Sequence, residues 1–155
     1  MAKIFACYFV FHIIAAGSAI ACSIPGDTAE LRTIIVERVN AERKRAGIPA
    51  LSRSGALRKA AQDLACDNAD QEQWSHTGRN GSDLRARLKS AGYRFRAANE
   101  NVGRFRSADR AVTEWMGSRP HRANILSPAI RAIGVGVAVG RDGRAYWVMV
   151  GGRAR

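Results

Sequence analysis

Two histidines are the side chains in this chain best suited to chemistry. His76 lies in the segment Ser75-His76-Thr77-Gly78, and His121 follows Ser118-Arg119-Pro120. Such segments form loops and helix ends, where side chains reach the surface or a cleft. Imidazole transfers protons near neutral pH and ligates metals in its neutral form. Because the two histidines are 45 positions apart, no local metal-binding motif joins them, and the residues alone leave open that both are structural.

Two acidic residues are candidates to accompany the histidines. Glu100 lies between two amides in Asn99-Glu100-Asn101, and Glu114 directly precedes Trp115. A carboxylate flanked by amides is not typical of a hydrophobic core. Glu114 falls within a predicted helix and either faces a cleft or faces solvent. The four candidate cleft residues are therefore His76, Glu100, Glu114 and His121.

The elements that must position these residues are mostly helices. Apolar residues recur at helical spacing in four segments, which are residues 27–46, 54–69, 82–91 and 107–116. A further helical turn is predicted from Pro120 to Leu126. Asp27, Ser82 and Ser107 are the predicted N-caps of three of the helices. Residues 94–103 are mixed in character and are predicted to form a strand or an extended loop.

The C-terminal part of the chain has the pattern of a β-hairpin. Bulky residues alternate along Ile133 to Val139 and along Tyr146 to Val150, around the turn signal Asp142-Gly143. The other face of the first segment carries Gly134 and Gly136, so another element is expected to pack close against its backbone. Helices combined with a small antiparallel sheet that ends in this hairpin predict an α+β sandwich.

The N-terminal segment predicts export. Lys3 precedes an almost wholly apolar run from Ile4 to Ile20, and Ala19-Ile20-Ala21 has the small-x-small pattern of a cleavage site. A membrane-spanning helix is the alternative, but the run is short for one and carries a histidine. We therefore expect residues 1–21 to be a signal peptide. Residues 22–155 are then expected to form one secreted or periplasmic domain with no transmembrane segment.

The cysteines fit an exported protein. Cys7 lies in the predicted signal peptide, which leaves Cys22 and Cys66 as an even pair. In an oxidising compartment the simplest interpretation is a disulfide between Cys22 and Cys66. The alternative is acylation of Cys22, because Ala19-Ile20-Ala21-Cys22 resembles a lipoprotein cleavage sequence. In that case the protein would be anchored to a membrane through its first mature residue.

The chain is strongly basic, with 25 Lys and Arg residues against 13 Asp and Glu residues. Loss of Lys3 with the signal peptide leaves a net charge of +11. Nucleic acid is not the expected partner, because the protein is exported, its basic residues are scattered, and it has no nucleic-acid motif. The charge is either a general property of the surface or a means of adhering to anionic envelope material, such as lipid headgroups or acidic polysaccharide.

Several sequence blocks occur in an order that is characteristic of one family. They are Ser75-His76-Thr77, Glu100-Asn101-Val102, the string from Val112 to Leu126, and Ile133-Gly134-Val135-Gly136, preceded by Asn40-Ala41-Glu42-Arg43 in the opening helix. In this order the chain resembles the CAP superfamily, which includes cysteine-rich secretory proteins, antigen 5 and pathogenesis-related 1 proteins. The resemblance extends from about Ala29 to Val150 and is closest to small bacterial members.

The resemblance implies a three-layer α-β-α sandwich with a central cleft. In the typical family site two histidines and two acids face that cleft, where the histidines can hold a divalent metal such as zinc. His76, His121 and Glu100 match three of these positions. The second acid of the family lies just beyond the tryptophan, where this chain has Gly117-Ser118, and Glu114 on the same helical face is the candidate substitute. Zinc would bind through the two histidines and would not be required for the fold.

Three functions follow as expectations. The first is a non-enzymatic extracytoplasmic binding module whose cleft takes a divalent metal, a lipid or sterol, or an anionic envelope glycan; the resemblance supports it, since family members bind sterols and other lipids. The second is a metal-dependent hydrolase that acts on peptide or peptidoglycan. The third is a secreted effector that acts through surface contacts alone. No nucleophile with a partnered base stands out, so no catalytic residue is assigned and the first function is favoured.

Overall fold

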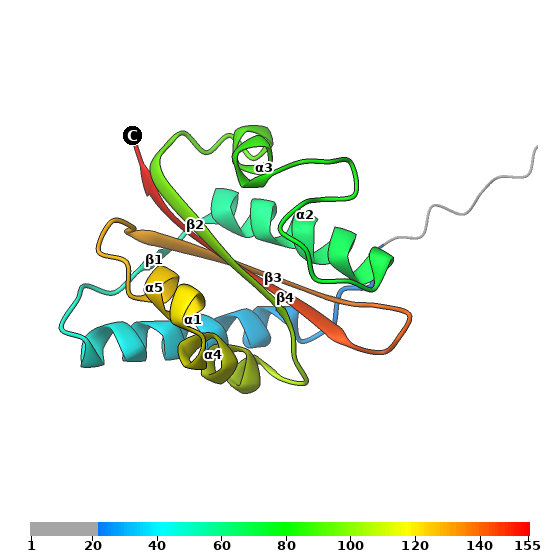
Figure 1. Ribbon diagram of the computed structural model, residues 1–155, viewed down its shortest axis with the longest axis horizontal. Coiled ribbons are helices and arrows are strands. Elements are labelled where there is room, and N and C mark those ends of the chain that lie inside the picture. Colours follow the sequence, from blue (N-terminus) through cyan, green and yellow to red (C-terminus); the bar gives the residue numbers. More distant parts are fainter. Residues whose placement is uncertain (1–21) are drawn as a thin grey trace, which may run out of the picture.

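A computed structural model describes residues 22–155 (Figure 1). The predicted signal peptide, with Cys7, lies outside the described residues. Nine helices and strands follow one another in the described part of the chain. They are α1 (Thr28–Arg45), β1 (Ser52–Arg53), α2 (Gly55–Gln71), α3 (Leu84–Ser90), β2 (Phe95–Arg104), α4 (Ala108–Gly117), α5 (Arg119–Ile125), β3 (Ala132–Val139) and β4 (Ala145–Ala154).

The strands form one sheet between two layers of helices. Its order is β1-β3-β4-β2, in which β2, β4 and β3 are antiparallel neighbours and the short β1 pairs parallel to β3. Helices α1, α4 and α5 lie on one side of the sheet, and α2 and α3 lie on the other (Figure 1). The predicted α-β-α sandwich is therefore confirmed, with a parallel strand at one edge that the sequence pattern did not indicate.

Two glycines of β3 explain how closely helix α2 approaches the sheet. A Cβ added to Gly134 would lie 2.1 Å from the backbone of Leu57, and one added to Gly136 would lie 2.4 Å from the carbonyl oxygen of Ala61. Helix α2 therefore packs directly on the backbone of β3. This confirms the prediction that an element lies against the bare face of the first hairpin strand.

Each side of the sheet has its own hydrophobic core. The core under α1, α4 and α5 includes the alternating residues Ile133, Val135 and Val137 together with buried Trp115. The core under α2 and α3 is formed by the opposite faces of β3, β4 and β2 and by small and branched residues of α2. Strand β2 is the edge strand beside β4. Successive side chains along it point to opposite faces of the sheet and therefore to opposite helical layers.

Two of the three predicted N-caps differ in detail from the structure. Ser107 caps α4 as predicted, since its hydroxyl accepts a hydrogen bond from the backbone of Arg110. Asp27 lies at the start of α1, but its side chain makes no capping hydrogen bond. Helix α3 is capped by Asp83 instead of Ser82, because the Asp83 carboxylate accepts a hydrogen bond from the backbone of Ala86 (2.7 Å). The shift leaves Ser82 in the preceding loop.

The N-terminal segment is fastened to both α2 and the sheet. Cys22 forms a disulfide with Cys66 of α2, and Ser23 makes a bridge to Val139 at the end of β3. The predicted disulfide is therefore present in the structure. Within residues 22–155, no helix combines the length and the apolar character that crossing a membrane would require.

Candidate functional site

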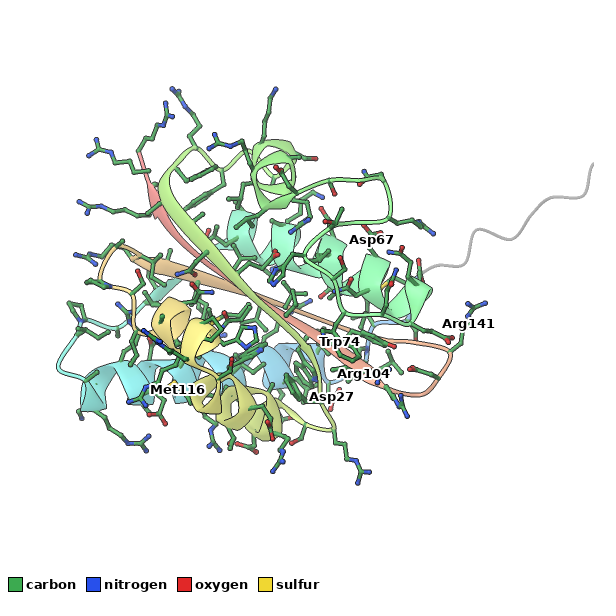
Figure 2. All side chains as sticks on the ribbon, in the orientation of Figure 1. Asp27, Asp67, Trp74, Arg104, Met116 and Arg141 are labelled. Atoms are coloured by element: carbon green, nitrogen blue, oxygen red, sulfur yellow. A yellow bond between two sulfur atoms is a disulfide. The ribbon has the colours of Figure 1, made fainter. Side chains whose placement is uncertain are left out.

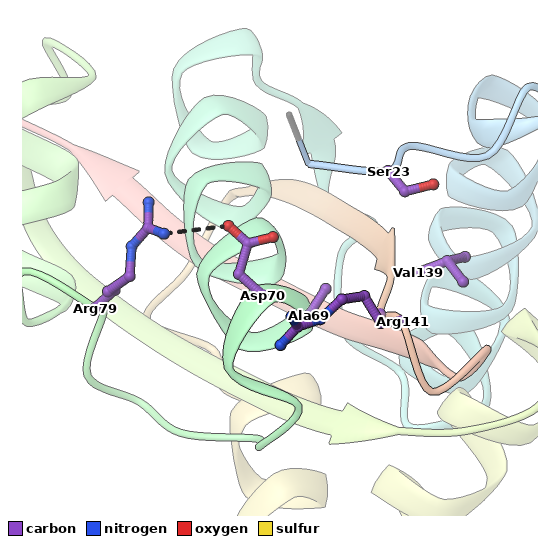
Figure 3. Close-up of a pocket in the computed structure, with 7 residues that line it drawn as sticks. Ser23, Ala69, Asp70, Arg79, Val139 and Arg141 are labelled. Carbon is purple, nitrogen blue, oxygen red and sulfur yellow. Dashed lines mark ion pairs between the residues drawn. The ribbon is translucent and has the colours of Figure 1, made fainter. Parts of the chain in front are cut away.

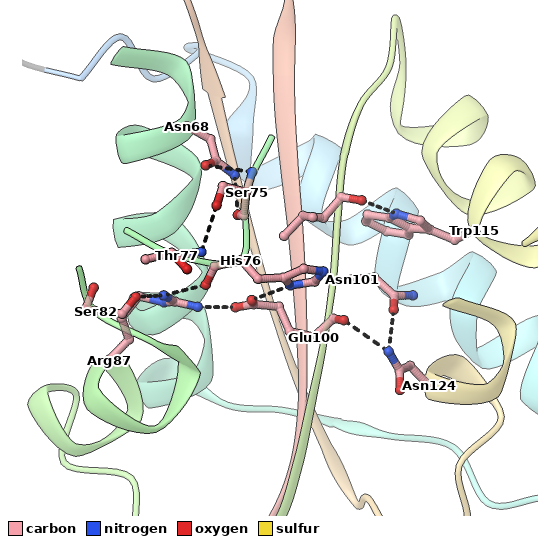
Figure 4. Close-up of polar contacts among 11 residues, drawn as sticks. Asn68, Ser75, His76, Thr77, Ser82, Arg87, Glu100, Asn101, Trp115 and Asn124 are labelled. Carbon is pink, nitrogen blue, oxygen red and sulfur yellow. Dashed lines mark hydrogen bonds and ion pairs between the residues drawn. The ribbon is translucent and has the colours of Figure 1, made fainter. Parts of the chain in front are cut away.

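The loop between α2 and α3 carries His76, and α2 holds that loop in place. The side-chain amide of Asn68 donates to the carbonyl oxygen of Ser75 (3.1 Å), and its oxygen accepts from the backbone N–H of Ser75 (3.2 Å). This two-point clamp fixes the residue directly before His76 (Figure 4). His76 therefore lies in a loop whose backbone is held to α2 by these two hydrogen bonds.

Glu100 of β2 orients His76 and is itself held by a buried arginine. The Nδ1–H group of His76 donates to Oε1 of Glu100 (2.9 Å), and Nη2 of Arg87 donates to Oε2 (2.7 Å). The side chains of Arg87 and Glu100 are each only 4% exposed. Arg87 also donates to the carbonyl oxygens of His76 (3.1 Å) and Ser82 (2.7 Å). Both carboxylate oxygens are thus engaged, and Nε2 of His76 is the ring nitrogen that Glu100 does not bind.

The asparagines next to Glu100 connect β2 to α5. Asn101 donates to the carbonyl oxygen of His121 (3.0 Å), while Asn124 donates both to the carbonyl oxygen of Glu100 (3.0 Å) and to the side-chain oxygen of Asn101 (2.8 Å). Asn99 completes the join by donating to the carbonyl oxygen of Asn124 (3.0 Å). Alternation along the strand sends Glu100 toward His76 and Asn101 toward α5 (Figure 4). Asn99 has the same parity as Asn101 and bonds to the same helix.

His76 and His121 line the same pocket. It has a volume of about 440 Å³ and is bounded by these two histidines, by Trp74, and by the end of β2 from Val102 to Phe105. Burial lowers the pKa of His121 below its usual range, and the nearby His76 lowers it further. His121 is therefore neutral at pH 7, and the pocket presents two imidazoles from opposite helical layers.

An aromatic ring and a guanidinium group form the mouth of this pocket. Trp74 is 55% exposed, and the guanidinium carbon of Arg104 lies 4.7 Å from the centroid of its ring. The two side chains lie together beside the end of β2 (Figure 2). Arg104 is also 3.7 Å from the carboxylate of Asp142. The indole is thus braced from one side and open to solvent.

Glu114 does not join the two histidines. Its carboxylate pairs with Arg110 one turn earlier on α4 (2.6 Å), and its side chain is 40% exposed. Helix α4 turns Ala111 and Trp115 into the core, which directs Glu114 away from the cleft and into a wide neighbouring hollow that also includes Phe105. Of the four candidate residues the structure therefore brings together His76, Glu100 and His121.

A zinc ion fits the pocket only in part. Two imidazoles with an orienting carboxylate behind one of them match the ligands and the supporting shell that zinc prefers. Within residues 22–155, however, no three His, Cys, Asp or Glu side chains are placed to share a metal ion. An ion held by His76 and His121 would take its remaining ligands from water or from a bound molecule.

A second hollow lies near the disulfide and contains none of the predicted site residues. It has a volume of about 340 Å³ and lies between the end of α2, Ser23 and the β3–β4 turn. Asp70 and Arg79 form an ion pair across it (3.5 Å), with Arg141 at its rim (Figure 3). Its charged groups already have partners, since Arg141 lies 3.4 Å from Glu72.

Sequence reasoning missed Arg87, Asn68, Trp74 and Arg104 as parts of the site. Arg87 could have been noticed, because it lies on the apolar face of its helix between Leu84 and Leu88. A charged residue in that position implies a buried partner. Asn68, Trp74 and Arg104 carried no such signal, since their partners are distant in the sequence.

Comparison with known proteins places this geometry in context. The profile of the cysteine-rich secretory protein family, CAP, matches residues 36–150. The uncharacterized protein YkwD of Bacillus subtilis is 31% identical over 115 residues, an alignment that covers 74% of this chain and 45% of that protein. This chain therefore spans less than half of that relative.

Two solved structures are similar in fold. An outer surface protein of Borrelia burgdorferi has a TM-score of 0.78 and 18% identity, covering 87% of this chain and 100% of that one. An extracellular SCP-domain protein of Bacillus anthracis has a TM-score of 0.74 and 22% identity, covering 86% of this chain and 45% of that one. At these identities the similarity extends to the fold.

Proposed function

The chain belongs to the cysteine-rich secretory protein family, and we propose that it is an extracytoplasmic binding protein whose cleft takes an anionic saccharide of the cell envelope. A location outside the cytoplasm is supported by the Cys22–Cys66 disulfide, because such bonds persist in oxidising compartments. The two similar structures are described as an outer surface protein and an extracellular protein.

The pairing of Trp74 with Arg104 at the mouth of the cleft carries this proposal. An exposed indole offers a flat apolar surface on which a sugar ring packs. Arg104 is held against that ring, so a guanidinium group capable of binding a carboxylate lies beside the same surface. The imidazoles of His76 and His121 add hydrogen-bonding groups deeper in the pocket.

The polar groups in the lining also favour a saccharide over a sterol. A fully apolar ligand would remove Arg104 and the two imidazoles from water and would offer them no partner beyond those that Asp142 and Glu100 already supply, which is unfavourable. A saccharide with a carboxylate satisfies those groups and still buries its ring against Trp74. The aromatic side chains Trp74 and Phe105, combined with several hydrogen-bond donors, support this chemical class of ligand.

Binding is favoured over catalysis because Glu100 is already committed. Its two oxygens accept hydrogen bonds from His76 and Arg87, and it is buried between them. A carboxylate in this position orients an imidazole and stabilises an arginine. It does not reach the pocket as a free general base, which hydrolysis of a glycosidic or peptide bond would use.

Tryptophan fluorescence offers a direct test. Trp115 and Trp147 are buried, so a change in emission reports mainly on Trp74. The ligands are soluble peptidoglycan glycan fragments from which the stem peptides have been removed, because these carry the free muramic acid carboxylate. Neutral chitin oligosaccharides serve as the uncharged control ligand. We expect saturable quenching by the acidic fragments and about tenfold weaker binding in Arg104→Gln, the loss typical of one charge-assisted hydrogen bond.

Arg153→Gln is the matched control variant, because Arg153 is exposed at the far end of β4. It should bind as the unmodified protein does. Calorimetry on Trp74→Ala supplies a second readout that does not depend on fluorescence. Equal heats for the unmodified protein, Trp74→Ala and Arg104→Gln would contradict the proposed binding surface.

A metal-dependent hydrolase is the second candidate, and one observation favours it. Glu100 holds Nδ1 of His76, which leaves Nε2 as a ligand, and His121 in the same pocket is neutral because its pKa is lowered. His76 and His121 would hold the ion, and a bound divalent metal supplies an activated water for hydrolysis. Peptide bonds or peptidoglycan would be the substrate class.

The two candidates differ in their dependence on pH. Protonation of His121, whose pKa is lowered by burial and by His76, strengthens binding of an anionic saccharide as the pH falls below about 6.5, whereas it weakens zinc binding. Zinc calorimetry should be run on the unmodified protein, His76→Ala and His121→Ala. Release of peptidoglycan fragments that requires zinc and both histidines would replace the binding proposal with the hydrolase.

A further inference from the structure

A separate hollow, lined by three arginines, lies at the opposite edge of the sheet from the cleft. It has a volume of about 280 Å³ and is formed where α1, β1 and the start of α2 meet. Arg32, Arg53 and Arg58 line it, one from each element. Since β1 and β2 are the two edges of the sheet, this hollow is separate from the pocket of His76 and His121.

The described residues do not neutralise the charges of this arginine hollow. Within residues 22–155, neither Arg32, Arg53 nor Arg58 forms an ion pair with a carboxylate. The partners that two of them have are uncharged. Arg32 donates to the side-chain oxygen of Gln62 (2.6 Å), and Arg53 donates to the hydroxyl of Thr33 (3.1 Å).

Arg32 shows the unfavourable consequences of this arrangement. Its Nε is buried and has no hydrogen-bond partner among the described residues. Burial lowers the pKa of the Arg32 guanidinium, and the like charge of Arg58 lowers it further. A buried donor without an acceptor and two neighbouring like charges both destabilise the folded protein. An anion in the hollow would offset the repulsion between these like charges.

The surroundings specify the kind of anion. Gly55 begins helix α2 beside the hollow, and a Cβ added there would meet nothing within 4 Å, so the partly positive start of this 17-residue helix is accessible. Ile133 and Val36 supply an apolar wall. A planar carboxylate pairs with one guanidinium fork, whereas three guanidinium groups from three directions match a tetrahedral anion with several acceptor oxygens.

We propose that the arginine hollow binds a phosphate ester through Arg32, Arg53 and Arg58. The phosphoryl oxygens accept hydrogen bonds from the guanidinium groups that line the hollow, and the carbon atoms of the ester lie against the apolar wall. The same chemistry is offered by a soluble phosphate ester and by the headgroup of an anionic phospholipid. This site is independent of the saccharide cleft, and its failure would leave that proposal intact.

Nuclear magnetic resonance of the arginine side chains tests the site directly. The Nε–Hε signal of Arg32 should shift in a saturable manner when glycerol 3-phosphate is added at constant ionic strength. Sodium chloride at the same ionic strength is the control, and it should leave the signal in place. A signal that moves equally with chloride, or that does not move, would overturn the proposal.

Calorimetry with paired variants provides the second readout. Arg53→Gln/Arg58→Gln removes two exposed residues of the hollow, so folding should be preserved, and binding of glycerol 3-phosphate should weaken by about tenfold or more. Arg94→Gln/Arg96→Gln removes the same charge from exposed positions outside the hollow and should bind normally. Equal weakening in both double variants would mean that net charge, not this hollow, attracts the ester.

Vesicles distinguish the two sources of the phosphate. If the headgroup is the ligand, the protein binds phosphatidylglycerol vesicles, soluble glycerol 3-phosphate competes for binding, and Arg53→Gln/Arg58→Gln abolishes it. If a soluble ester is the ligand, glycerol 3-phosphate binds while vesicle binding is equal for the two double variants. The absence of binding to both ligands by the unmodified protein would refute the site.

Discussion

Replacing Arg87 by methionine removes the arginine that pairs with the buried carboxylate of Glu100 and leaves that carboxylate with the histidine at the cleft. Both side chains are 4% exposed, and their atoms are 2.7 Å apart. Methionine keeps the length and the apolar contacts of the arginine stem, so the change isolates the loss of the guanidinium group. The same variant also removes the hydrogen bonds that Arg87 donates to the carbonyl oxygens of His76 and Ser82.

The expected loss of stability is large. Breaking a buried ion pair by removing one partner costs about 3–5 kcal/mol, because the other charge is left in a poorly solvated position. Domains of this size lose roughly 3–4 °C in melting temperature per kcal/mol. Arg87→Met should therefore melt roughly 9–20 °C below the unmodified protein, in a thermal unfolding transition followed by circular dichroism.

Two comparisons make the result interpretable. Lys89→Met removes a positive charge from an exposed position of the same helix and should change stability by no more than about 0.5 kcal/mol. Adding Glu100→Gln to Arg87→Met removes the stranded carboxylate, so the double variant should be more stable than additivity predicts, by about 1–3 kcal/mol. Strict additivity, or a loss below about 1 kcal/mol in Arg87→Met, would refute the role assigned to this pair.

Three further predictions concern packing, cross-linking and pH. Gly136→Ala should lower the free energy of unfolding by about 1–3 kcal/mol in urea, because its Cβ would meet the backbone of α2. Gly117→Ala is the control: a Cβ there meets nothing within 4 Å, so this variant should be neutral or slightly stabilising. Replacing Cys22 and Cys66 by serine should cost about 4 kcal/mol, the loop-entropy value for the 44-residue separation, and an unchanged urea midpoint would speak against it. The lowered pKa of His121 means that the unfolded chain binds this proton at higher pH than the folded protein, so the free energy of unfolding should fall as the pH drops below about 6.5. His121→Gln should flatten that fall between about pH 7.5 and about pH 5, and an identical slope in the variant would assign the dependence to other groups.

Local patterns in the sequence were sufficient for most helices and strands. Ser107 and the β3–β4 turn at Asp142-Gly143 act within a few residues of themselves, and both lie where they were predicted. The small residues Gly134 and Gly136 even indicated that another element must touch the strand. The cap of α3 was assigned one residue early, because Ser82 and Asp83 are both good N-caps and only their hydrogen bonds distinguish them.

Part of the candidate site could likewise be predicted from the sequence, and part could not. The sequence order of the family blocks identified His76, Glu100 and His121, which the structure brings to one cleft. Glu114 was a candidate from its helical position alone. Its actual direction depends on how α4 rotates to bury Trp115, and that rotation is decided by packing against other elements.

The histidines, the predicted export signal, the paired cysteines and the alternating hairpin could be inferred from the sequence by itself, because each is expressed in residue types or short-range spacing. The tertiary structure decided which groups satisfy one another. Only folding brings Arg87 to Glu100 and Trp74 to Arg104, and only folding leaves Arg32 beside Arg58 with an unmet donor. Hydrogen bonds and charges act over a few ångströms in space, irrespective of separation along the chain, so the chemistry of the site became visible only when distant segments were packed together.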